Sequence, residues 1–590
     1  MKRHYTSRSK VLFLLLLVIV AQAKAQTRDF TFSNGASKEG FTTITQTGAA
    51  LQVRHALKQM RLCTFTDNGY SGEQIEISGV FLPAEEGKPN LPTSSRFVAI
   101  PNGSTVNYSI NSSQFQTINN VDLIAAAPIK AGNDDTPSTY EKDSSIYGVN
   151  AFYPESPVII SEVMNLRGVQ TVILSVTPYQ YNPVTKVLKV YHDLDISLSF
   201  VGGDGHFGED RLRSPYYDPI LQQSLMNYNQ LPAIDYETRM REWVSNRPTG
   251  CEYLIVIPNN ETFRPYAQQL ANYRIRQGIK TEVKSLSEMG CSNTGELKNY
   301  FHNAYSTWAI PPVAVLLFGD HNTNMANGIP AETISHPTEG TCITDNQYAD
   351  CTGDYLPDIC FARLVAASAT EAKMMVDKTL DYEYNHPNMN ASTYQNPITA
   401  LGWQTERWFQ ICSEVVGGYW RNHGKEPVRI NAIYDGTPGS IWSSNQNTYM
   451  VTSYFGPNGR GYIPATPAEL GGWTGGTAQQ VVTAVNNGAF ILQHRDHGYN
   501  QGWGEPSFST SHVSQMNNTD KLTFVMTINC QTGNFSYGGN CLVEAFMRRT
   551  YNNKGAGAVG CVGPTQTSFS FVNDAFVWGM YDLFDPNFMP

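Results

Sequence analysis

The hydrophobic pattern changes its period near residue 251, and this change limits the folds open to the chain more than any other feature. Before it, short runs of alternating or β-branched residues recur between turn clusters, without a convincing long helix. After it, apolar strand patterns alternate with segments whose apolar residues recur at helical spacing. The 590 residues are also too many for one core. We therefore expect an all-β, sandwich-like domain followed by an α/β region.

The α/β region predicts a largely parallel sheet flanked by helices. Its strands are expected at 253–257, 313–318, 429–434, 489–493, 522–528 and 557–562, and its helices at 262–277, 369–384, 477–486 and 541–551. In such sheets the chemistry sits at the carboxyl ends of the strands, where loops are free to carry it. A division into two subdomains is expected near residue 386.

The first 25 residues have the features of a secretory signal peptide. Four basic residues precede an apolar run at 11–21, and small-residue steps follow, with cleavage expected after Ala23 or Ala25. The run is shorter than the ~20 residues that a spanning helix needs. We expect a protein that is secreted or held at the cell surface without a membrane span. The β domain is assigned to 26–213, a linker to 214–249 and the α/β domain to 250–590.

Composition excludes several classes of function. The formal charge is −10, so there is no basic excess to bind nucleic acid. Ten cysteines without a CxxC pair support neither a disulfide scaffold nor a zinc site. No HExxH or GxSxG motif is present, so a zinc peptidase and a serine α/β-hydrolase are unsupported.

Reactive side chains follow two of the predicted strands. The strand at 489–493 leads to His497 and Gly498, and the strand at 522–528 leads to Cys530. If the two strands are neighbours, an imidazole and a thiol emerge at the same sheet edge, as a cysteine nucleophile requires. The N–H groups of Gly498 and Cys530 could then form an oxyanion hole.

Each residue also has a structural interpretation. Free cysteine is among the most buried residue types, and a loop histidine is often structural. For a single cysteine or a single histidine, the structural role is favoured over the catalytic one. Their occurrence together at the ends of two apolar strands favours catalysis.

The segments 496–506 (DHGYNQGWGEP) and 528–549 (INCQTGNFSYGGNCLVEAFMRR) resemble the histidine and cysteine segments of gingipains, secreted cysteine endopeptidases of family C25 with a caspase-like fold. More diffuse similarity lies at 315–320 and 344–363. In the β half, residues 87–103 and 177–191 look like the N-terminal propeptide of that family. The resemblance covers most of residues 70–590.

The resemblance implies a zymogen in which the β domain is an inhibitory propeptide and Arg211 or Arg213 is the processing site. It assigns His497 as general base and Cys530 as nucleophile, with a thioester acyl-enzyme as intermediate. The propeptide is expected to pack over these two residues. A basic side chain from it, or from the linker around the two arginines, is expected to fill the specificity pocket.

The family also carries an acidic residue that orients the histidine, on the strand end aligned with residues 400–406. No acid stands at the expected point here. Gln404 can orient the imidazole as a neutral partner, and Glu406 is the acidic alternative if the loop is shifted.

Gingipains cleave after Arg or Lys through an acidic residue in the S1 pocket, so a basic P1 residue is expected. Asp574 and Glu414 are the candidate acids, although an acid at either place is more often a surface charge. No cofactor is required. The family binds calcium, and the aspartate-rich stretch 345–358 has suitable oxygen ligands. The expected partners are protein or peptide substrates and the chain's own propeptide.

Two other functions stay open. A non-catalytic surface or adhesion protein that keeps the fold would explain the missing acid, and its β module would leave the cleft open. A secreted hydrolase or transpeptidase acting on another acyl substrate could use the same dyad. Family members normally continue into an immunoglobulin-like domain and a secretion domain. Neither is recognisable here, so the sequence given could be a fragment.

Overall fold

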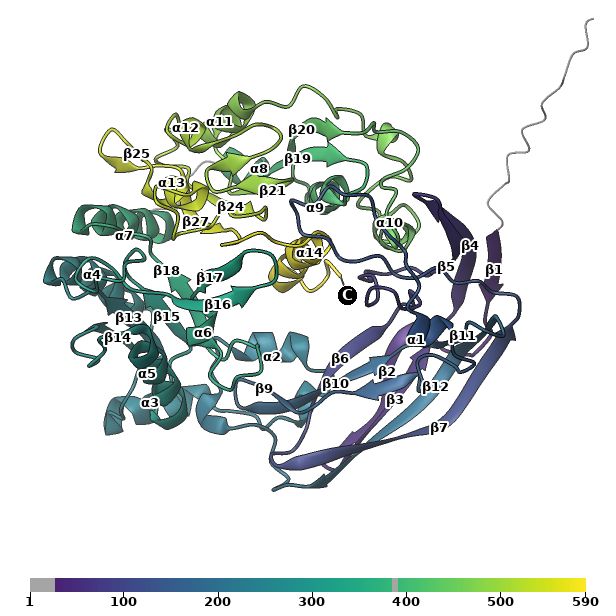
Figure 1. Cartoon of the computed structure of the whole chain (residues 1–590). Helices are drawn as coiled ribbons and strands as arrows, with labels where there is room; N and C mark the ends of the chain where they lie inside the picture. Colours follow the sequence, from purple (N-terminus) through teal and green to yellow (C-terminus); the bar gives the residue numbers. More distant parts are fainter. Residues whose placement is uncertain (1–26, 385–390, 590) are drawn as a thin grey trace, which may run out of the picture.

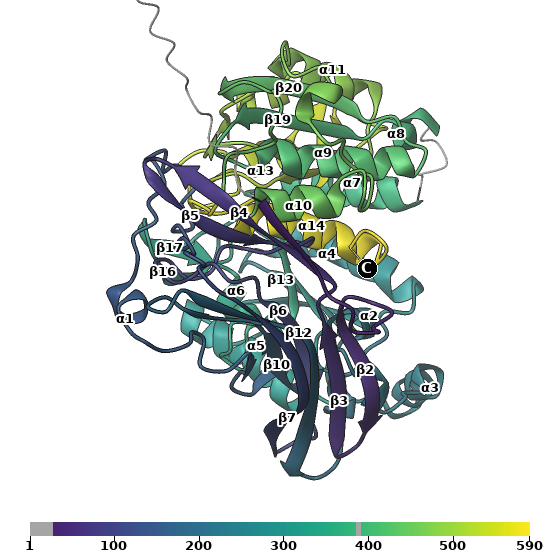
Figure 2. The same ribbon diagram turned by 90° about the vertical axis from the view of Figure 1, so that its right-hand side faces the viewer.

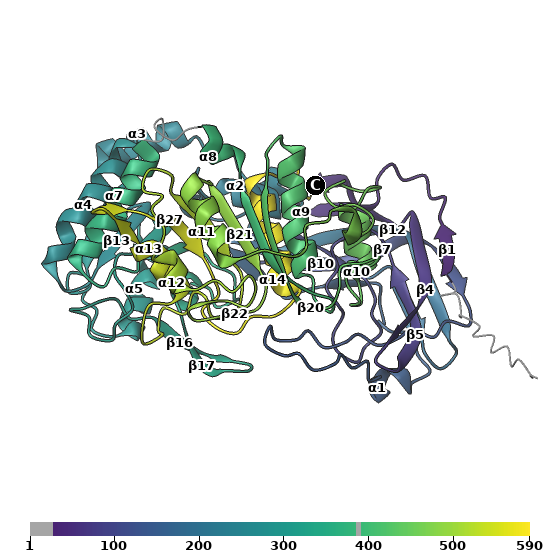
Figure 3. The same ribbon diagram turned by 90° about the horizontal axis from the view of Figure 1, so that it is seen from above.

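The computed structural model describes residues 27–384 and 391–589. The expected signal peptide lies outside the described residues. The chain forms a β domain and two α/β units, which lie beside one another in Figures 1 and 3. This arrangement confirms the predicted class, an α/β region preceded by an all-β domain.

The β domain contains three antiparallel sheets. One has the order β11-β12-β3-β2, with β7 also pairing β12, and a second has the order β6-β10-β8, with β9 pairing β10. Both contribute to one hydrophobic core, in which Val53 and Ile196 of the first sheet join Val98 and Leu174 of the second. The domain is therefore a sandwich, as predicted, and the third sheet, β1-β4-β5, lies beside it (Figure 2).

The bounds of these strands are as follows: β1 Thr27–Thr31, β2 Gly40–Thr47, β3 Ala50–Ala56, β4 Gln59–Asp67, β5 Tyr70–Glu76, β6 Ser94–Ala99, β7 Ser104–Ile118, β8 Val158–Ile160, β9 Met164–Leu166, β10 Val169–Val176, β11 Tyr179–Asn182 and β12 Val187–Gly202. One short helix, α1 (Ser144–Tyr147), follows the long loop after β7.

The segment expected to be a linker, 214–249, is more structured than a linker. It contains α2 (Asp218–Ser224) and α3 (Tyr236–Asn246). Tyr217, Leu221 and Leu225 pack into the sandwich core, so this part belongs physically to the β domain. The sequence did not predict this packing, because only a few apolar residues follow the loop-like stretch 202–215.

The first α/β unit has a four-stranded parallel sheet in the order β14-β13-β15-β18. Its strands are β13 (Tyr253–Ile257), β14 (Thr281–Ser285), β15 (Ala314–Leu317) and β18 (Cys360–Arg363). Its helices are α4 (Arg264–Arg276), α5 (Thr294–Thr307), α6 (Asn346–Ala349) and α7 (Ala369–Tyr384), and a hairpin is formed by β16 (Glu332–His336) and β17 (Gly340–Thr344).

The second unit has a five-stranded parallel sheet in the order β20-β19-β21-β24-β27. Its strands are β19 (Ile398–Gln404), β20 (Val428–Asp435), β21 (Ile491–Arg495), β24 (Thr523–Thr527) and β27 (Ala558–Val562). Its helices are α8 (Ala391–Gln395), α9 (Phe409–Asn422), α10 (Thr448–Phe455), α11 (Ala478–Asn487), α12 (Thr510–Val513), α13 (Leu542–Arg548) and α14 (Val572–Phe584). Two two-stranded ribbons, β22 (Gly498–Tyr499) with β23 (Gly502–Trp503) and β25 (Thr550–Tyr551) with β26 (Lys554–Gly555), complete it.

The α/β region thus has two parallel sheets, one on each side of the expected break, instead of one continuous sheet. Because β21 pairs in parallel with both β19 and β24, the carboxyl ends of these three strands lie at one edge. No helix in the described part of the chain is long and apolar enough to cross a membrane.

Candidate active site

The edge formed by β19, β21 and β24 brings the two predicted reactive residues to one place. His497 follows β21 by two residues and Cys530 follows β24 by three. Asn529 joins the two strand ends, since its Oδ1 accepts from the Asp496 backbone N–H at 2.7 Å and its Nδ2 lies 2.8 Å from His494 Nδ1. Sequence reasoning did not single out Asn529, although it directly precedes the cysteine.

Local backbone geometry at the thiol is unusual. Cys530 is buried, and the next residue, Gln531, has a φ of +62°. A non-glycine residue in this region is uncommon and is found disproportionately at functional sites. Gly498 packs so closely that a Cβ built on it would lie 2.6 Å from Asn529 Cβ and 2.9 Å from the Cys530 carbonyl oxygen. A side chain at 498 would therefore push the two loops apart.

His497 is held by three neighbours of the second unit. Its Nε2 lies 2.7 Å from Gln404 Oε1, at the carboxyl end of β19. The rings of Phe409 and Tyr434 lie 5.3 and 4.9 Å from the imidazole, centroid to centroid. Burial lowers the pKa of His497, so the neutral base is favoured. With Nε2 donating to the Gln404 oxygen, Nδ1 is the nitrogen that can accept a proton.

Glu406 does not reach the histidine. It is exposed in the turn after β19 and lines a pocket that also contains Lys130 of the β domain. Gln404 and Glu406 therefore occupy different positions, and only Gln404 contacts His497.

A segment of the β domain crosses this site, as the dark-blue loop that reaches toward α9 and α14 in Figure 1. Ala131 pairs antiparallel with Phe569, the Gly132 N–H donates to the Ser568 carbonyl at 2.6 Å, and the Ser570 N–H donates to the Lys130 carbonyl at 3.1 Å. Extended peptides add to exposed backbone in this way when they bind as ligands.

Gly132 is the point of closest approach. A Cβ built on it would lie 2.6 Å from Cys530 Sγ, and its backbone lies close enough to His497 to oppose the lowering of that pKa. The following residues reach the histidine as well, because Asp135 Oδ1 lies 3.7 Å from His497 Nε2. Sequence reasoning missed both residues. Nothing in the single sequence marks a Gly-Asn-Asp-Asp stretch of a β domain as the occupant of a site almost 400 residues away.

Asp574 and Glu414, the two candidate acids for a basic P1 residue, are both buried in ion pairs. Asp574 Oδ1 lies 2.7 Å from Arg495 Nε, and Glu414 Oε1 lies 2.6 Å from Arg429 Nη2. Asp574 also accepts from the Phe571 N–H, and Glu414 from Asn431. Each carboxylate is thus already neutralised inside the second unit.

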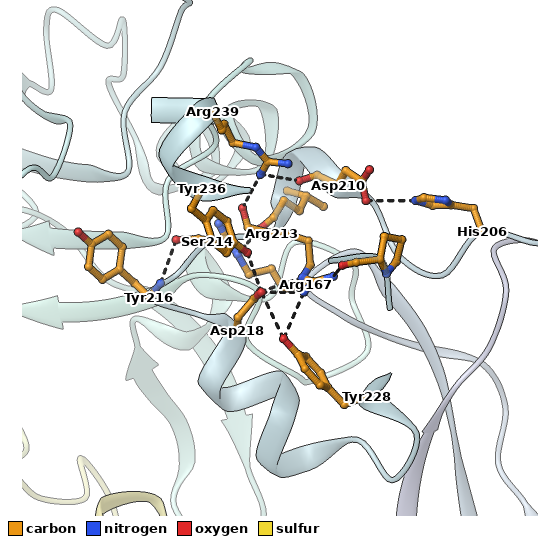
Figure 4. A network of polar contacts seen from close by, with 12 residues as sticks. Arg167, His206, Asp210, Arg213, Ser214, Tyr216, Asp218, Tyr228, Tyr236 and Arg239 are labelled. Atoms are coloured by element: carbon orange, nitrogen blue, oxygen red, sulfur yellow. Dashed lines mark hydrogen bonds and ion pairs between the residues drawn. The ribbon is translucent and has the colours of Figure 1, made fainter. Parts of the chain in front are cut away.

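Both candidate processing residues are held by polar contacts, and Figure 4 shows those of Arg213. The Arg213 side chain is 3% exposed, and its Nη2 lies 2.6 Å from Asp218 Oδ2. Arg211 donates to the carbonyls of Tyr305 and Trp308. Neither reaches the cleft, where the basic residue of the β domain is instead Lys130. Cleavage after Arg213 requires local opening of this network.

The aspartates between 345 and 358 are engaged by protein groups. Asp345 pairs with Arg363, Asp350 accepts from the N–H groups of residues 353–355, and Asp358 accepts from Tyr305. Among the described residues, no group of three or more His, Cys, Asp or Glu is arranged to hold a metal ion. Calcium binding by this stretch stays a prediction.

Two family models match the chain. Residues 246–590 match peptidase family C25, and residues 44–230 match the C25 propeptide. The chain belongs to peptidase family C25. The β domain corresponds to the propeptide model and is called the prodomain below; the two α/β units together are called the peptidase domain.

Curated relatives agree with this placement. Gingipain R1 of Porphyromonas gingivalis is 24% identical over 509 residues, which cover 85% of this chain and 45% of the relative. Lys-gingipain of the same species is 23% identical over 528 residues, 87% of this chain and 27% of the relative. The chain therefore spans less than half the length of these two relatives. A solved structure of the Arg-specific cysteine proteinase gingipain R aligns with a TM-score of 0.44 and 19% identity, over 57% of this chain and 68% of that one.

Proposed function

We propose that the chain is a secreted cysteine endopeptidase made as a zymogen. The observation that carries this proposal is the antiparallel pairing of residues 130–132 with residues 568–570, which lays Gly132 against Cys530 and His497. A peptide segment thus lies along the site as an extended ligand would. The surface-protein alternative calls for an open cleft, and this cleft is covered.

The proposed reaction is acyl transfer through a thioester. His497 Nδ1 takes the proton of the Cys530 thiol, and the thiolate attacks the carbonyl carbon of the scissile peptide bond. The N–H groups of Gly498 and Cys530 are the proposed donors to the oxyanion. The amine leaves with the proton held by His497, and a water activated by the same imidazole then hydrolyses the thioester.

Gln404 replaces the acid that the resemblance implies. A neutral amide oxygen orients the ring and fixes its tautomer, but it stabilises the imidazolium less than a carboxylate would. The basic P1 residue remains a prediction, tested by cleavage of peptide libraries. Secretion likewise remains a proposal drawn from residues 1–25.

The test is nucleophile labelling combined with peptide cleavage. A recognition sequence for a specific protease is inserted after the exposed Ala233, and the chain is cut there to free the prodomain. Exposed Cys360 is replaced by Ala in all variants to reduce background labelling. After dilution, we expect an iodoacetamide probe to label the cut chain much faster than the intact one.

We further expect Cys530→Ala to abolish the labelling, and Cys530→Ala and His497→Ala each to lower kcat/KM by several orders of magnitude. Equal labelling with and without Cys530 would remove the nucleophile assignment. Equal activity of cut and intact chains, after dilution, would end the zymogen proposal.

A further inference from the structure

Arg407 lies at the cleft with an unusual set of partners. It is 4% exposed, and its Nη1 donates to Ser570 Oγ at 2.8 Å. Its Nη2 donates to the Asp134 carbonyl at 2.5 Å and to Asp135 Oδ1 at 3.0 Å. Over the described residues, the ion pair with Asp135 is the only one found for Arg407. The carboxylate that neutralises this guanidinium therefore comes from the prodomain.

When the prodomain leaves, the Arg407 guanidinium keeps its hydrogen bond to Ser570 Oγ but loses the Asp135 carboxylate. The guanidinium then presents an unpaired positive charge to the open cleft, so the cleft binds an anion that restores the charge-assisted hydrogen bond. The planar fork of an arginine matches a carboxylate better than any other cation does. Glu406 is adjacent in sequence, but it is exposed and its charge acts on Lys130.

Gln404 belongs to the same anion site. Its Nε2 donates to Asp135 Oδ1 at 3.3 Å while its Oε1 holds His497. A carboxylate at 404, as in the family pattern, would repel Asp135 at this distance. Partial burial opposes the charged form of Asp135, but the hydrogen bonds from Arg407 and Gln404 help to outweigh it, and its pKa lies below the usual value.

We propose that Arg407 and Gln404 form a subsite for an acidic side chain of the substrate, and that Asp135 occupies it in the latent chain. Gly132 lies at the thiol and Asp135 is three residues further along. The segment turns at this point, since the Asp134 N–H donates to the Ala131 carbonyl at 3.0 Å. A substrate that makes the same turn carries its acidic residue on the C-terminal side of the cleaved bond. This deepens the proposed function, on which it rests, and it assigns Arg407 as a specificity residue.

The binding test uses a chain that cannot cleave itself. The Cys530→Ala chain is cut after Ala233, and the affinity of the prodomain for the peptidase domain is measured by dilution. Asp135→Asn removes the anion, and Asp134→Asn is the matched control because the Asp134 carboxylate hydrogen-bonds Thr136 of its own turn. The Asp135 side chain is 50% exposed, so solvent screening reduces the effect of the pair. We expect about a fivefold loss of affinity for Asp135→Asn and less than about twofold for Asp134→Asn.

A double-mutant cycle separates the pair from its surroundings. Arg407→Gln should remove most of the effect of Asp135→Asn, whereas Arg407→Lys, which keeps the charge without the fork, should keep part of it. Equal losses for Asp135→Asn and Asp134→Asn, or an unchanged Asp135→Asn effect in the Arg407→Gln chain, would overturn the subsite.

The activity test uses peptides with Asp, Asn or Lys three residues after the cleaved bond. We expect Asp to be preferred over Asn by about tenfold in kcat/KM, and the preference to vanish in Arg407→Gln. An Asp-to-Asn ratio that is the same in both enzymes contradicts the proposal. If no peptide is cleaved at all, the proposed function fails, and the binding test still decides the subsite.

Discussion

Arg167→Ala should release the prodomain from a site far from the nucleophile. Arg167 is 1% exposed at the tip of the β9–β10 hairpin and inserts against the first α/β unit. Its Nη1 donates to the carbonyls of Pro312 and Asp358 at 3.1 and 2.7 Å, and its backbone N–H donates to Asp358 Oδ1 at 3.1 Å. The guanidinium thus binds two backbone carbonyls of the peptidase domain.

The backbone supports a functional role for this tip. Arg167 has a φ of +47° and Gly168 a φ of +78°, the pattern of a two-residue turn that favours Asn-Gly. An arginine in the first position is strained, and such strain persists where the surroundings fix it. Alanine keeps the same backbone strain, so Arg167→Ala measures the side chain alone.

In the cut chain, the two hydrogen bonds from the Arg167 guanidinium join the prodomain to the peptidase domain, and their loss sets the expected decrease in affinity. A hydrogen bond to a charged group contributes about 1.5–3 kcal/mol, so losing two weakens prodomain binding by about 3 kcal/mol or more. That is an affinity loss of about 150-fold. The assay is the dilution measurement on the Cys530→Ala chain cut after Ala233.

The matched control is Arg54→Ala, since Arg54 pairs with Asp193 inside the prodomain. If a folded Arg167→Ala prodomain binds the peptidase domain with an affinity within threefold of the Arg54→Ala prodomain, then Arg167 does not hold the prodomain on the first α/β unit.

Two further perturbations test the site itself. Gly132→Ala should raise the rate of Cys530 labelling in the intact chain, because the added Cβ would lie 2.6 Å from Sγ and must displace the segment. Gly48→Ala, where an added Cβ meets open space, is the matched control, and equal labelling rates in the two variants would contradict the placement of Gly132. Asp496→Asn should stabilise the chain above pH 7 and little at pH 4, measured by urea unfolding. Burial raises the pKa of Asp496 to about 7, so the folded state retains a proton that the unfolded state loses from about pH 4, and wild-type stability falls across that window. A pH-independent effect would contradict this assignment.

Local patterns predicted six of the nine strands in the two parallel sheets and four of the helices. The strand at 253–257 and the helix at 369–384 were predicted to the residue, since each has a strong apolar period. The strand β14 was missed because TEVKS is short, polar and at a sheet edge. Division into two sheets depends on strand order, which no local pattern encodes.

Pairings between distant residues were beyond a single sequence. The sequence predicted His497 and Cys530 at the ends of two strands, and the structure shows that these strands are neighbours. The assignment of Asp574 to a specificity pocket rested on its position after a strand. Its partner, Arg495, is 79 residues away in the chain, and only the fold shows that the two carboxylate oxygens are already engaged.

The two prodomain contacts together define what activation must accomplish. Residues 130–135 bind the second α/β unit at the nucleophile, and Arg167 binds the first unit through Pro312 and Asp358. Cutting the linker breaks only the tether, which lowers the effective concentration of the inhibitor without removing either contact. Release then requires both contacts to open at once, because opening one leaves the other holding the fragment close. A chain cut once should therefore stay latent at high concentration and become active on dilution, and weakening either contact should shift that concentration upward.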